Sequence, residues 1–217
     1  MNRKLKTFSH ILKILKSALK IGVSQILNYK FRLLFVVVMF VFAACGDTYI
    51  PRPYGYFRVD LPEHSYRQLD TLSLPYRFDV PQIARIVSRE TAENKHWIDI
   101  QYPTLNGSIY CSYKPIKGDM FELSEEARKI VYKHNVRADG IGESAFEHPE
   151  QRVYSVLYNL EGNTASPIQF VVTDSVRHFL RASLYFDNVP NKDSIAPMVQ
   201  YVREDIVRLI ESFEWKR

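Results

Sequence analysis

IQFVVT (168–173) and HFLRASLYF (178–186) are the two stretches of sequence that decide the fold. Both are rich in β-branched and aromatic residues, which favour β-strands. Only the four residues DSVR (174–177) separate them, so we expect a tight turn and an antiparallel pair. A third strand is predicted at 152–159, where alternate side chains make one strongly apolar face.

Three more strands are predicted nearer the N-terminus. Residues 76–80 alternate between apolar and polar side chains and lie between two prolines, which limit a strand. Residues 97–102 alternate in the same way, and 108–114 follow the turn signal Asn106-Gly107. These last two segments are therefore expected to form a hairpin.

A helix is predicted at 119–134. Its apolar stripe repeats at helical spacing, with Ala127, Ile130, Val131 and His134. Asp119 and Glu122 have the spacing of a capping box, and Ser124 is a rival N-cap. We expect His134 to be a core or C-terminal-turn histidine rather than a ligand.

The last helix has the clearest pattern in the chain. Its apolar residues are spaced by three or four positions: Ile195, Val199, Val202, Ile206, Leu209 and Phe213. Asp193 or Ser194 is the expected N-cap, and Pro197 is expected in the first turn, where its missing N–H costs little. Trp215 follows the helix, and we expect it to close the edge of the core.

The predicted order is a group of strands, a helix, three further strands and a final helix. This order favours an α+β fold, a mainly antiparallel sheet with two amphipathic helices. It is similar to the order in the α/β/α sandwich of the PsbP/Mog1 type. Residues 57–217 are long enough for one hydrophobic core and are expected to form a single domain.

A basic leader and a short apolar run precede this domain. Residues 33–44 are 12 consecutive apolar residues that end in two alanines, and Cys45-Gly46-Asp47 follow. Spanning a bilayer takes about 20 apolar residues, so the run fits a cleaved signal peptide at 1–44 better than a transmembrane anchor. A cysteine directly after the small residues is typical of a lipoprotein, which carries acyl chains such as palmitate there. An uncleaved anchor is the alternative, since Phe42 stands where such signals usually have leucine.

Charge divides the chain at the same point. Residues 1–44 hold eight Lys and Arg and no Asp or Glu, whereas the whole chain is +5, so residues 45–217 carry a formal charge of −3. Part of the leader, residues 4–27, is a basic amphipathic stretch. It is either sequence that precedes the true start or an interfacial helix. Because the mature chain has no basic excess, we expect no nucleic-acid partner.

The chain has two cysteines. If Cys45 is acylated, Cys111 has no disulfide partner within the chain; a Cys45–Cys111 disulfide is the alternative in an oxidising compartment. Cys111 shares its strand face with Ile109 and Tyr113, which indicates a buried, inert thiol. Residues 45–56 are predicted to be the lipidated cysteine and an extended linker with two prolines, which would hold the domain clear of the membrane.

Many short segments, kept in order, resemble the gliding motility lipoprotein GldD family of Bacteroidetes. They include YGYFRVDLP (54–62), GNTAS (162–166) and QFVVTDS (169–175), and the likeness runs to Trp215. The resemblance implies a cell-envelope lipoprotein needed for gliding and linked to type IX secretion. It implies other gliding and secretion lipoproteins and the envelope machinery as partners, and it brings no catalytic residues. We expect the protein on the outer membrane, facing the periplasm.

Motifs that carry catalysis do not occur in the sequence. It has no Gly-x-Ser-x-Gly, phosphate-binding loop, His-Glu-x-x-His or Cys-x-x-Cys. The histidines after the leader are scattered: His64, His96, His134, His148 and His178. Acidic residues such as Asp60, Glu63 and Asp139 adjoin turn-forming residues, which makes them turn or cap residues. We therefore predict no enzyme, no cofactor and no metal site.

Two segments are predicted as interaction surfaces. Aromatic and arginine residues, which are enriched at protein interfaces, cluster beside the linker: Tyr49, Arg52, Tyr54, Tyr56, Phe57 and Arg58. The alternative is that they pack against the edge of their own domain. The second segment is the loop that begins with Gly162 and Asn163, whose Gly-Asn and Ser-Pro pairs indicate a tight, exposed connection.

The sequence therefore favours a non-catalytic lipoprotein that supports gliding motility, type IX protein secretion or both through protein–protein contacts. A periplasmic enzyme or ligand-binding domain that acts on an envelope molecule is the alternative. A deep pocket that gathers several polar groups would favour the alternative. A flat surface with an exposed aromatic patch would favour the first hypothesis.

Overall fold

The structure is a computed structural model that describes residues 29, 32–34, 60–71, 73–187 and 191–216. Two compact units are distinguished, Met1–Pro53 and Tyr54–Arg217. In the first unit, the described residues are helical. The signal peptide, Cys45, the linker and the aromatic cluster at 49–58 lie outside the described residues, so these predictions stay predictions. Within the described ranges, no helix is both long and apolar enough to span a membrane.

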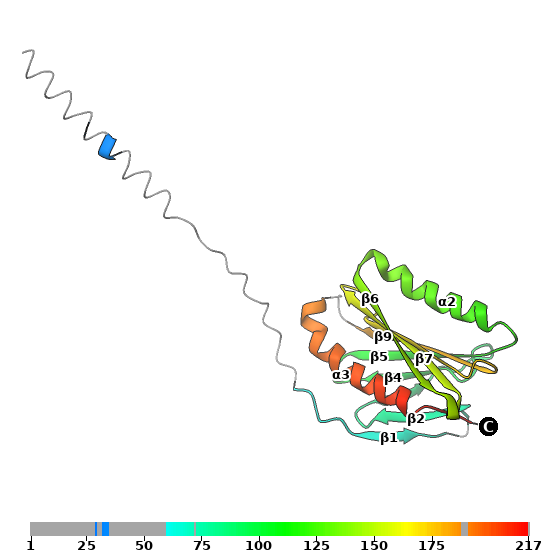
Figure 1. Cartoon of the computed structure of the whole chain (residues 1–217). Coiled ribbons are helices and arrows are strands. Elements are labelled where there is room, and N and C mark those ends of the chain that lie inside the picture. Colours follow the sequence, from blue (N-terminus) through cyan, green and yellow to red (C-terminus); the bar gives the residue numbers. More distant parts are fainter. Residues whose placement is uncertain (1–28, 30–31, 35–59, 72, 188–190, 217) are drawn as a thin grey trace, which may run out of the picture. The chain divides into compact units, whose positions relative to one another are not determined.

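A seven-stranded antiparallel sheet forms the centre of the second unit (Figure 1). Its strand order is β3-β4-β5-β9-β8-β7-β6. In the middle lie β8 (Ile168–Thr173) and β9 (His178–Phe186). On one side follow β5 (Gly107–Pro115), β4 (Ile98–Tyr102) and β3 (Arg85–Ser88), and on the other β7 (Val153–Gly162) and β6 (Ala138–His148).

The predicted strand pairings are confirmed. β8 and β9 pair antiparallel, with Phe170 opposite Ala182. β4 and β5 form the predicted hairpin, in which Ile100 lies opposite Ile109. Asn106 takes a left-handed backbone conformation (φ 49°) in the connection. Asparagine tolerates this conformation better than most non-glycine residues, which is why it marks the turn in the sequence.

A second, small sheet has the order β1-β2-β10. It consists of β1 (Tyr66–Leu69), β2 (Tyr76–Pro81) and β10 (Glu214–Trp215), and both pairings are antiparallel. Of these three, the sequence pattern predicted β2 alone. The other two have four residues and two residues, too few for apolar alternation to be recognised.

The large sheet is covered on both faces (Figure 1). The helix α3 (Lys192–Glu211) and the small sheet cover one face, and α2 (Met120–Tyr132) covers the other. The main core lies on the α3 side, and its largest fully buried side chains include Tyr76, Phe78, Phe170, Ile206 and Phe213. The predicted class, α+β with an antiparallel sheet and two amphipathic helices, is confirmed.

The start of α3 differs from the prediction. The N-cap is Asn191, whose Oδ1 accepts a hydrogen bond from the Ser194 N–H at 3.3 Å, rather than Asp193 or Ser194 itself. Because the helix begins at Lys192, Pro197 lies in the second turn and not in the first. There the proline removes the N–H that would bond the Asp193 carbonyl.

The start of α2 also differs. Asp119 occupies the N-cap position, but its side chain makes no capping hydrogen bond. Its carboxylate instead accepts from the Lys117 N–H at 2.7 Å. The predicted capping box with Glu122 is therefore wrong, and Ser124, the rival cap, lies inside the helix.

Two side chains that were predicted to be structural are buried or half-buried. His134 lies in a short 3₁₀ turn after α2, η1 (Lys133–Val136), and burial lowers its pKa. Cys111 is 3% exposed, and burial raises the pKa of its thiol. A thiol that stays protonated and covered is unreactive, as expected.

Two strand predictions need correction. β7 is buried on both faces rather than one: Val153 and Leu157 join the main core, while Tyr158 and Leu160 pack near α2. β6 was not predicted at all. It is an edge strand whose residues are exposed or half-buried, and its pairing with β7 shifts register between Ala138 and Gly140. It therefore has no apolar run that a pattern could detect.

Candidate functional site

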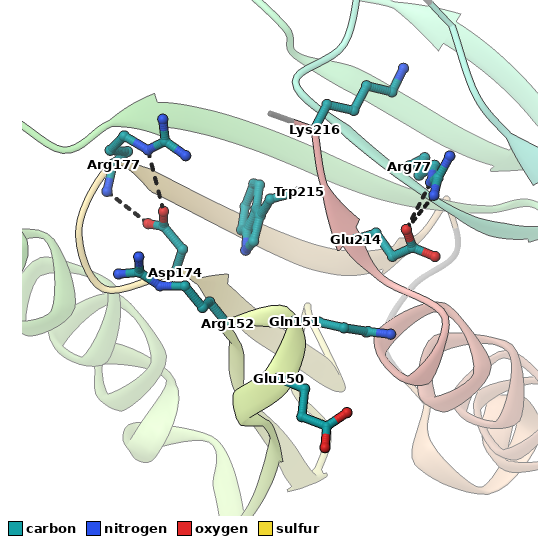
Figure 2. A pocket seen from close by; sticks show the side chains of 9 residues that line it. All are labelled: Arg77, Glu150, Gln151, Arg152, Asp174, Arg177, Glu214, Trp215 and Lys216. Atoms are coloured by element: carbon teal, nitrogen blue, oxygen red, sulfur yellow. Dashed lines mark hydrogen bonds and ion pairs between the residues drawn. The ribbon is translucent and has the colours of Figure 1, made fainter.

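A polar cleft of about 840 Å³ lies where separate segments of the chain meet (Figure 2). The segments are the turn between β6 and β7, the turn between β8 and β9, and the C-terminal end of the domain beside β2. Nine residues line the cleft: Arg77, Glu150, Gln151, Arg152, Asp174, Arg177, Glu214, Trp215 and Lys216. We call it the Trp215 cleft, because Trp215 is its one aromatic lining residue.

The turn between β6 and β7 presents Arg152 to the cleft. The turn is a short 3₁₀ helix, η2 (Pro149–Gln151), and the Arg152 N–H donates to the Pro149 carbonyl at 3.1 Å. Arg152 has a left-handed backbone (φ 54°, ψ 44°). That conformation costs a residue other than glycine about 1 kcal/mol. The guanidinium has no hydrogen bond or ion pair within the part of the chain that the structure describes.

Asp174 organises the turn between β8 and β9. Its Oδ1 accepts hydrogen bonds from the backbone N–H groups of Val176, Arg177 and His178, at 3.0, 2.7 and 2.8 Å. Burial by itself would raise the pKa of this carboxyl, but the N–H donors outweigh burial and the pKa lies below its ordinary value. The Arg177 guanidinium approaches the other oxygen only to 3.9 Å, and its side chain is 65% exposed. Such a pair contributes little stability.

Trp215 lies at the centre of the cleft (Figure 2). Its indole stacks on the His178 ring, with centroids 4.9 Å apart, and meets the Phe213 ring edge-on at the rim of the core. The His178 ring is held by a hydrogen bond of 2.7 Å between its Nδ1 and the Tyr113 hydroxyl. Among the described residues, the buried Trp215 Nε1–H has no acceptor. A buried donor without an acceptor is uncommon, because burial has cost it the hydrogen bonds of water.

Two of the four cations of the cleft are already paired. Arg77 donates through Nε to Glu214 Oε2 at 2.9 Å, and Lys216 Nζ lies 2.6 Å from Asp70 Oδ1. The other two are the arginines of the two turns, which have no comparable partner in the described ranges. Each guanidinium has five N–H donors in a planar arrangement that matches a carboxylate. The cleft can therefore bind an anionic group.

The loop predicted as an interaction surface has structural contacts. Gly162 has φ 102°, and a Cβ there would lie 2.8 Å from the Asp139 nitrogen and 2.9 Å from the Arg137 oxygen, so glycine is required. The Asn163 Oδ1 accepts from the Lys192 N–H at 2.9 Å, at the start of α3. These contacts join β6, β7 and α3. A role of this loop in binding a partner stays a prediction.

A second polar cluster surrounds Asp205 of α3, which is 1% exposed. Its Oδ1 lies 2.7 Å from His64 Nδ1 and accepts from the Tyr66 hydroxyl at 3.0 Å, and its Oδ2 accepts from the Tyr102 hydroxyl at 3.2 Å. Burial raises the pKa of Asp205, although its hydrogen-bond partners oppose the rise. His64 Nε2 faces Glu204 at 3.1 Å. Both ring nitrogens thus face carboxylates, whereas a catalytic triad needs one of them to face a nucleophile.

Little in the sequence indicates the Trp215 cleft. Its lining comes from distant segments: Arg77 and Glu214, for example, are 137 positions apart. Trp215 was predicted at the edge of the core, but its polar surroundings were not. The DSVR turn was predicted as a turn, yet not as a place that presents an arginine. Among the residues that the structure describes, no group of three or more His, Cys, Asp or Glu side chains suits a metal ion.

Comparison with known proteins identifies the family. The family model described as "Gliding motility lipoprotein GldD" matches residues 46–215. The comparison with curated proteins finds no match. Among solved structures, the chain is similar to cyanobacterial PsbP (CyanoP) from Synechocystis sp. PCC 6803. The identity is 12% and the TM-score 0.46, over 76% of this chain and 99% of that one. The chain thus belongs to the family of the gliding motility lipoprotein GldD.

Proposed function

We propose that this protein is a lipid-anchored envelope protein that supports gliding motility, type IX protein secretion or both by contacting other proteins, without catalysing a reaction. The observation that carries the proposal is the family match, which covers residues 46–215. The family accounts for the lipoprotein character and for gliding. The link to secretion comes from the resemblance of the sequence to that family.

The proposed anchor is Cys45. The 12 apolar residues before it and the confinement of the basic excess to residues 1–44 support cleavage and acylation at this position. The family match begins at the next residue. On this proposal the mature protein is held at the outer membrane, faces the periplasm and contacts other gliding and secretion lipoproteins. The aromatic and arginine residues beside the linker and the loop at Gly162 and Asn163 are proposed contact surfaces.

The non-catalytic part of the proposal is supported by the Asp205 cluster. It contains the His–Asp pair that most resembles catalytic machinery among the described residues. Its histidine lies between two carboxylates, and its aspartate is occupied by three donors. These contacts hold the segment before β1 against α3 and β4, so the cluster has a structural role.

Ligand binding is the second candidate function, and the Trp215 cleft favours it. The cleft gathers seven charged side chains around one aromatic ring, in a hollow of about 840 Å³. Its charged lining differs from the mostly apolar lining of typical small-molecule pockets. If the cleft binds a ligand, its charged lining therefore favours a segment of another macromolecule over a small molecule.

Replacing Cys45 by Ala in the full chain, expressed in its own organism, tests the anchor. We expect the protein to leave the membrane fraction, and we expect gliding and secretion, measured separately, to fail together with the anchor. Cys111→Ala is the matched control, because Cys111 is buried in the core and should leave membrane association unchanged. A Cys45→Ala protein that stays in the membrane fraction and supports gliding would contradict the proposal.

Cross-linking in native membranes, followed by co-purification with the full chain, tests the contacts. Recovery of gliding or secretion proteins with the native chain and their loss from Cys45→Ala is the expected result. If no protein of either system is recovered from cells that glide and secrete, the contact role is wrong.

A further inference from the structure

We propose that the Trp215 cleft binds an acidic peptide segment of a partner protein. In this complex Arg152 and Arg177 pair with carboxylates of the segment, and the segment lies against Trp215. The inference rests on the proposed role in protein contacts and assigns it a site. The observations that support it are the unpaired donors of the cleft, the backbone of Arg152 and the location of the two arginines on separate turns.

Four cationic and three acidic side chains line the cleft, so its formal charge is +1. Arg77 and Lys216 are held by acidic side chains of their own domain. Arg152 has no partner among the described residues, and Arg177 has one distant carboxylate at 3.9 Å. The chain after the leader has a net charge of −3. Two available guanidinium groups at one site therefore make a local positive charge on an otherwise acidic domain. They would attract a negatively charged ligand to this place.

The backbone conformation of Arg152 indicates that its side chain is there for binding and not for folding. Its left-handed conformation would suit glycine or asparagine better, and its side chain contributes no described hydrogen bond or ion pair to the domain. Turn geometry therefore does not account for an arginine here. A strained residue whose side chain faces a cleft is a reason to test that side chain for function.

A peptide fits the arrangement better than a single phosphate or sulfate group. Phosphate sites gather backbone N–H groups around one point. Here three backbone N–H groups at the β8–β9 turn already donate to Asp174 Oδ1 and are not available to a phosphate. The two arginines come from different turns on the rim (Figure 2), which suits carboxylates spaced along an extended chain. Gln151 and Glu150 can bond the amide groups of such a chain.

Trp215 also provides a probe for the test. The chain has two tryptophans. Trp97 Nε1–H donates to the Tyr113 carbonyl at 2.9 Å, whereas the Trp215 Nε1–H has no described acceptor. The two indole N–H signals in a ¹⁵N-correlated NMR spectrum should therefore respond differently to a ligand in the cleft. Trp97 serves as the internal control.

The experiment uses the full lipidated chain in detergent micelles, titrated with an acetylated, amidated tetraglutamate peptide. We expect the Trp215 indole signal to shift and saturate while the Trp97 signal stays in place. The tetraglutamine peptide should produce no shift. Arg152→Gly should weaken tetraglutamate binding about 2- to 5-fold, as expected when one exposed ion pair is lost. Lys129→Gln, on the exposed side of α2, is the matched control and should bind as the native chain does.

Three results would overturn the proposal. One is the absence of a Trp215 shift with tetraglutamate at millimolar concentration. The second is equal binding of tetraglutamine. The third is binding of inorganic phosphate or glucuronate as tight as that of tetraglutamate, which would make the cleft a site for small anions or acidic sugars. None of these results affects the Cys45 experiment, so the cleft and the anchored contact role can fail separately.

Discussion

The Asp205 cluster and the Trp215 cleft contain similar side chains but differ in how many of their hydrogen bonds are made. Both oxygens of Asp205 are occupied, by His64 and Tyr66 on one side and Tyr102 on the other, and the carboxylate is buried. In the cleft, the exposed Arg152 guanidinium has no partner among the described residues, and the exposed Arg177 guanidinium has only one distant carboxylate, at 3.9 Å. A fully satisfied buried network specifies and stabilises a fold, whereas unpaired donors at a surface are available to another molecule. The Asp205 cluster therefore stabilises the domain, whereas the Trp215 cleft has donors left for binding another molecule.

Asp205→Ala should have the largest effect on stability. It leaves the hydroxyls of Tyr66 and Tyr102 and the His64 ring without their common acceptor, and Tyr102 is only 1% exposed. We expect the free energy of unfolding to fall by about 2–4 kcal/mol, measured by urea denaturation. Asp205→Asn keeps one acceptor oxygen, so its free energy of unfolding should fall by less than that of Asp205→Ala. If Asp205→Ala is as stable as the native chain, the cluster does not hold the fold together.

The contributions of Asp205, from the cluster, and Asp174, from the cleft, to the free energy of unfolding should change with pH in opposite directions. The pKa of Asp205 is raised, mainly by burial, so the proton-linked part of its contribution to stability is complete below its unfolded pKa of about 3.9 and is lost as pH rises through the raised folded value. The pKa of Asp174 is lowered by backbone donors against the effect of burial. Its contribution is present above about 3.9 and is lost as pH falls through the lowered folded value.

Urea denaturation of Asp205→Asn and Asp174→Asn at a series of pH values checks this difference. Relative to the native chain, the loss in Asp205→Asn should shrink as pH rises above about 4, and the loss in Asp174→Asn should shrink as pH falls below about 4. His64 contacts both Asp205 and Glu204, so the difference between each variant and the native chain is the quantity to compare. Slopes of the same sign in both variants would contradict the assigned environments.

Arg152→Gly should have the smallest effect on stability. Unlike the Asp205 and Asp174 variants, it should not lower the free energy of unfolding. Glycine adopts the left-handed conformation of this position without the penalty of a Cβ, while its greater freedom in the unfolded chain offsets part of the gain. We expect the free energy of unfolding to stay the same or rise by up to about 1 kcal/mol. Arg152→Ala, which keeps the Cβ, is the control and should show no gain. A clear loss in Arg152→Gly would mean that the arginine supports the fold.

Much of the fold could be predicted from local patterns. The strands of the β8–β9 and β4–β5 hairpins and the apolar stripe of α3 are long enough for the period of two or of 3.6 to be recognised. β1, β3, β10 and β6 were missed for different reasons. The first three are too short, with four, four and two residues, and β6 is held by its pairing with β7 rather than by an apolar run of its own. The cap of α3 was misplaced because Asn191 lies before the residues that the apolar pattern marks.

The candidate site could hardly be predicted at all. A cleft is made by tertiary contacts, and neither Arg152 nor Arg177 belongs to a motif with a fixed spacing. Pro149 and the DSVR turn indicate where the chain reverses, but not that the two reversals lie beside each other and beside Trp215. The left-handed backbone of Arg152 gives no signal either, since glycine or asparagine would be expected there.

The contact of His64 and Tyr66 with Asp205 also has a mechanical consequence. A pulling force applied at the N-terminal side of the domain would be transferred to α3 through the hydrogen bonds of these two residues to Asp205. The apolar face of α3 is packed on the large sheet, so the load is spread over the core and does not act on the four-residue pairing of β1 with β2 alone. The force at which the domain gives way should therefore depend on one buried carboxylate. For a protein tethered to a membrane during movement, resistance to pulling matters alongside equilibrium stability.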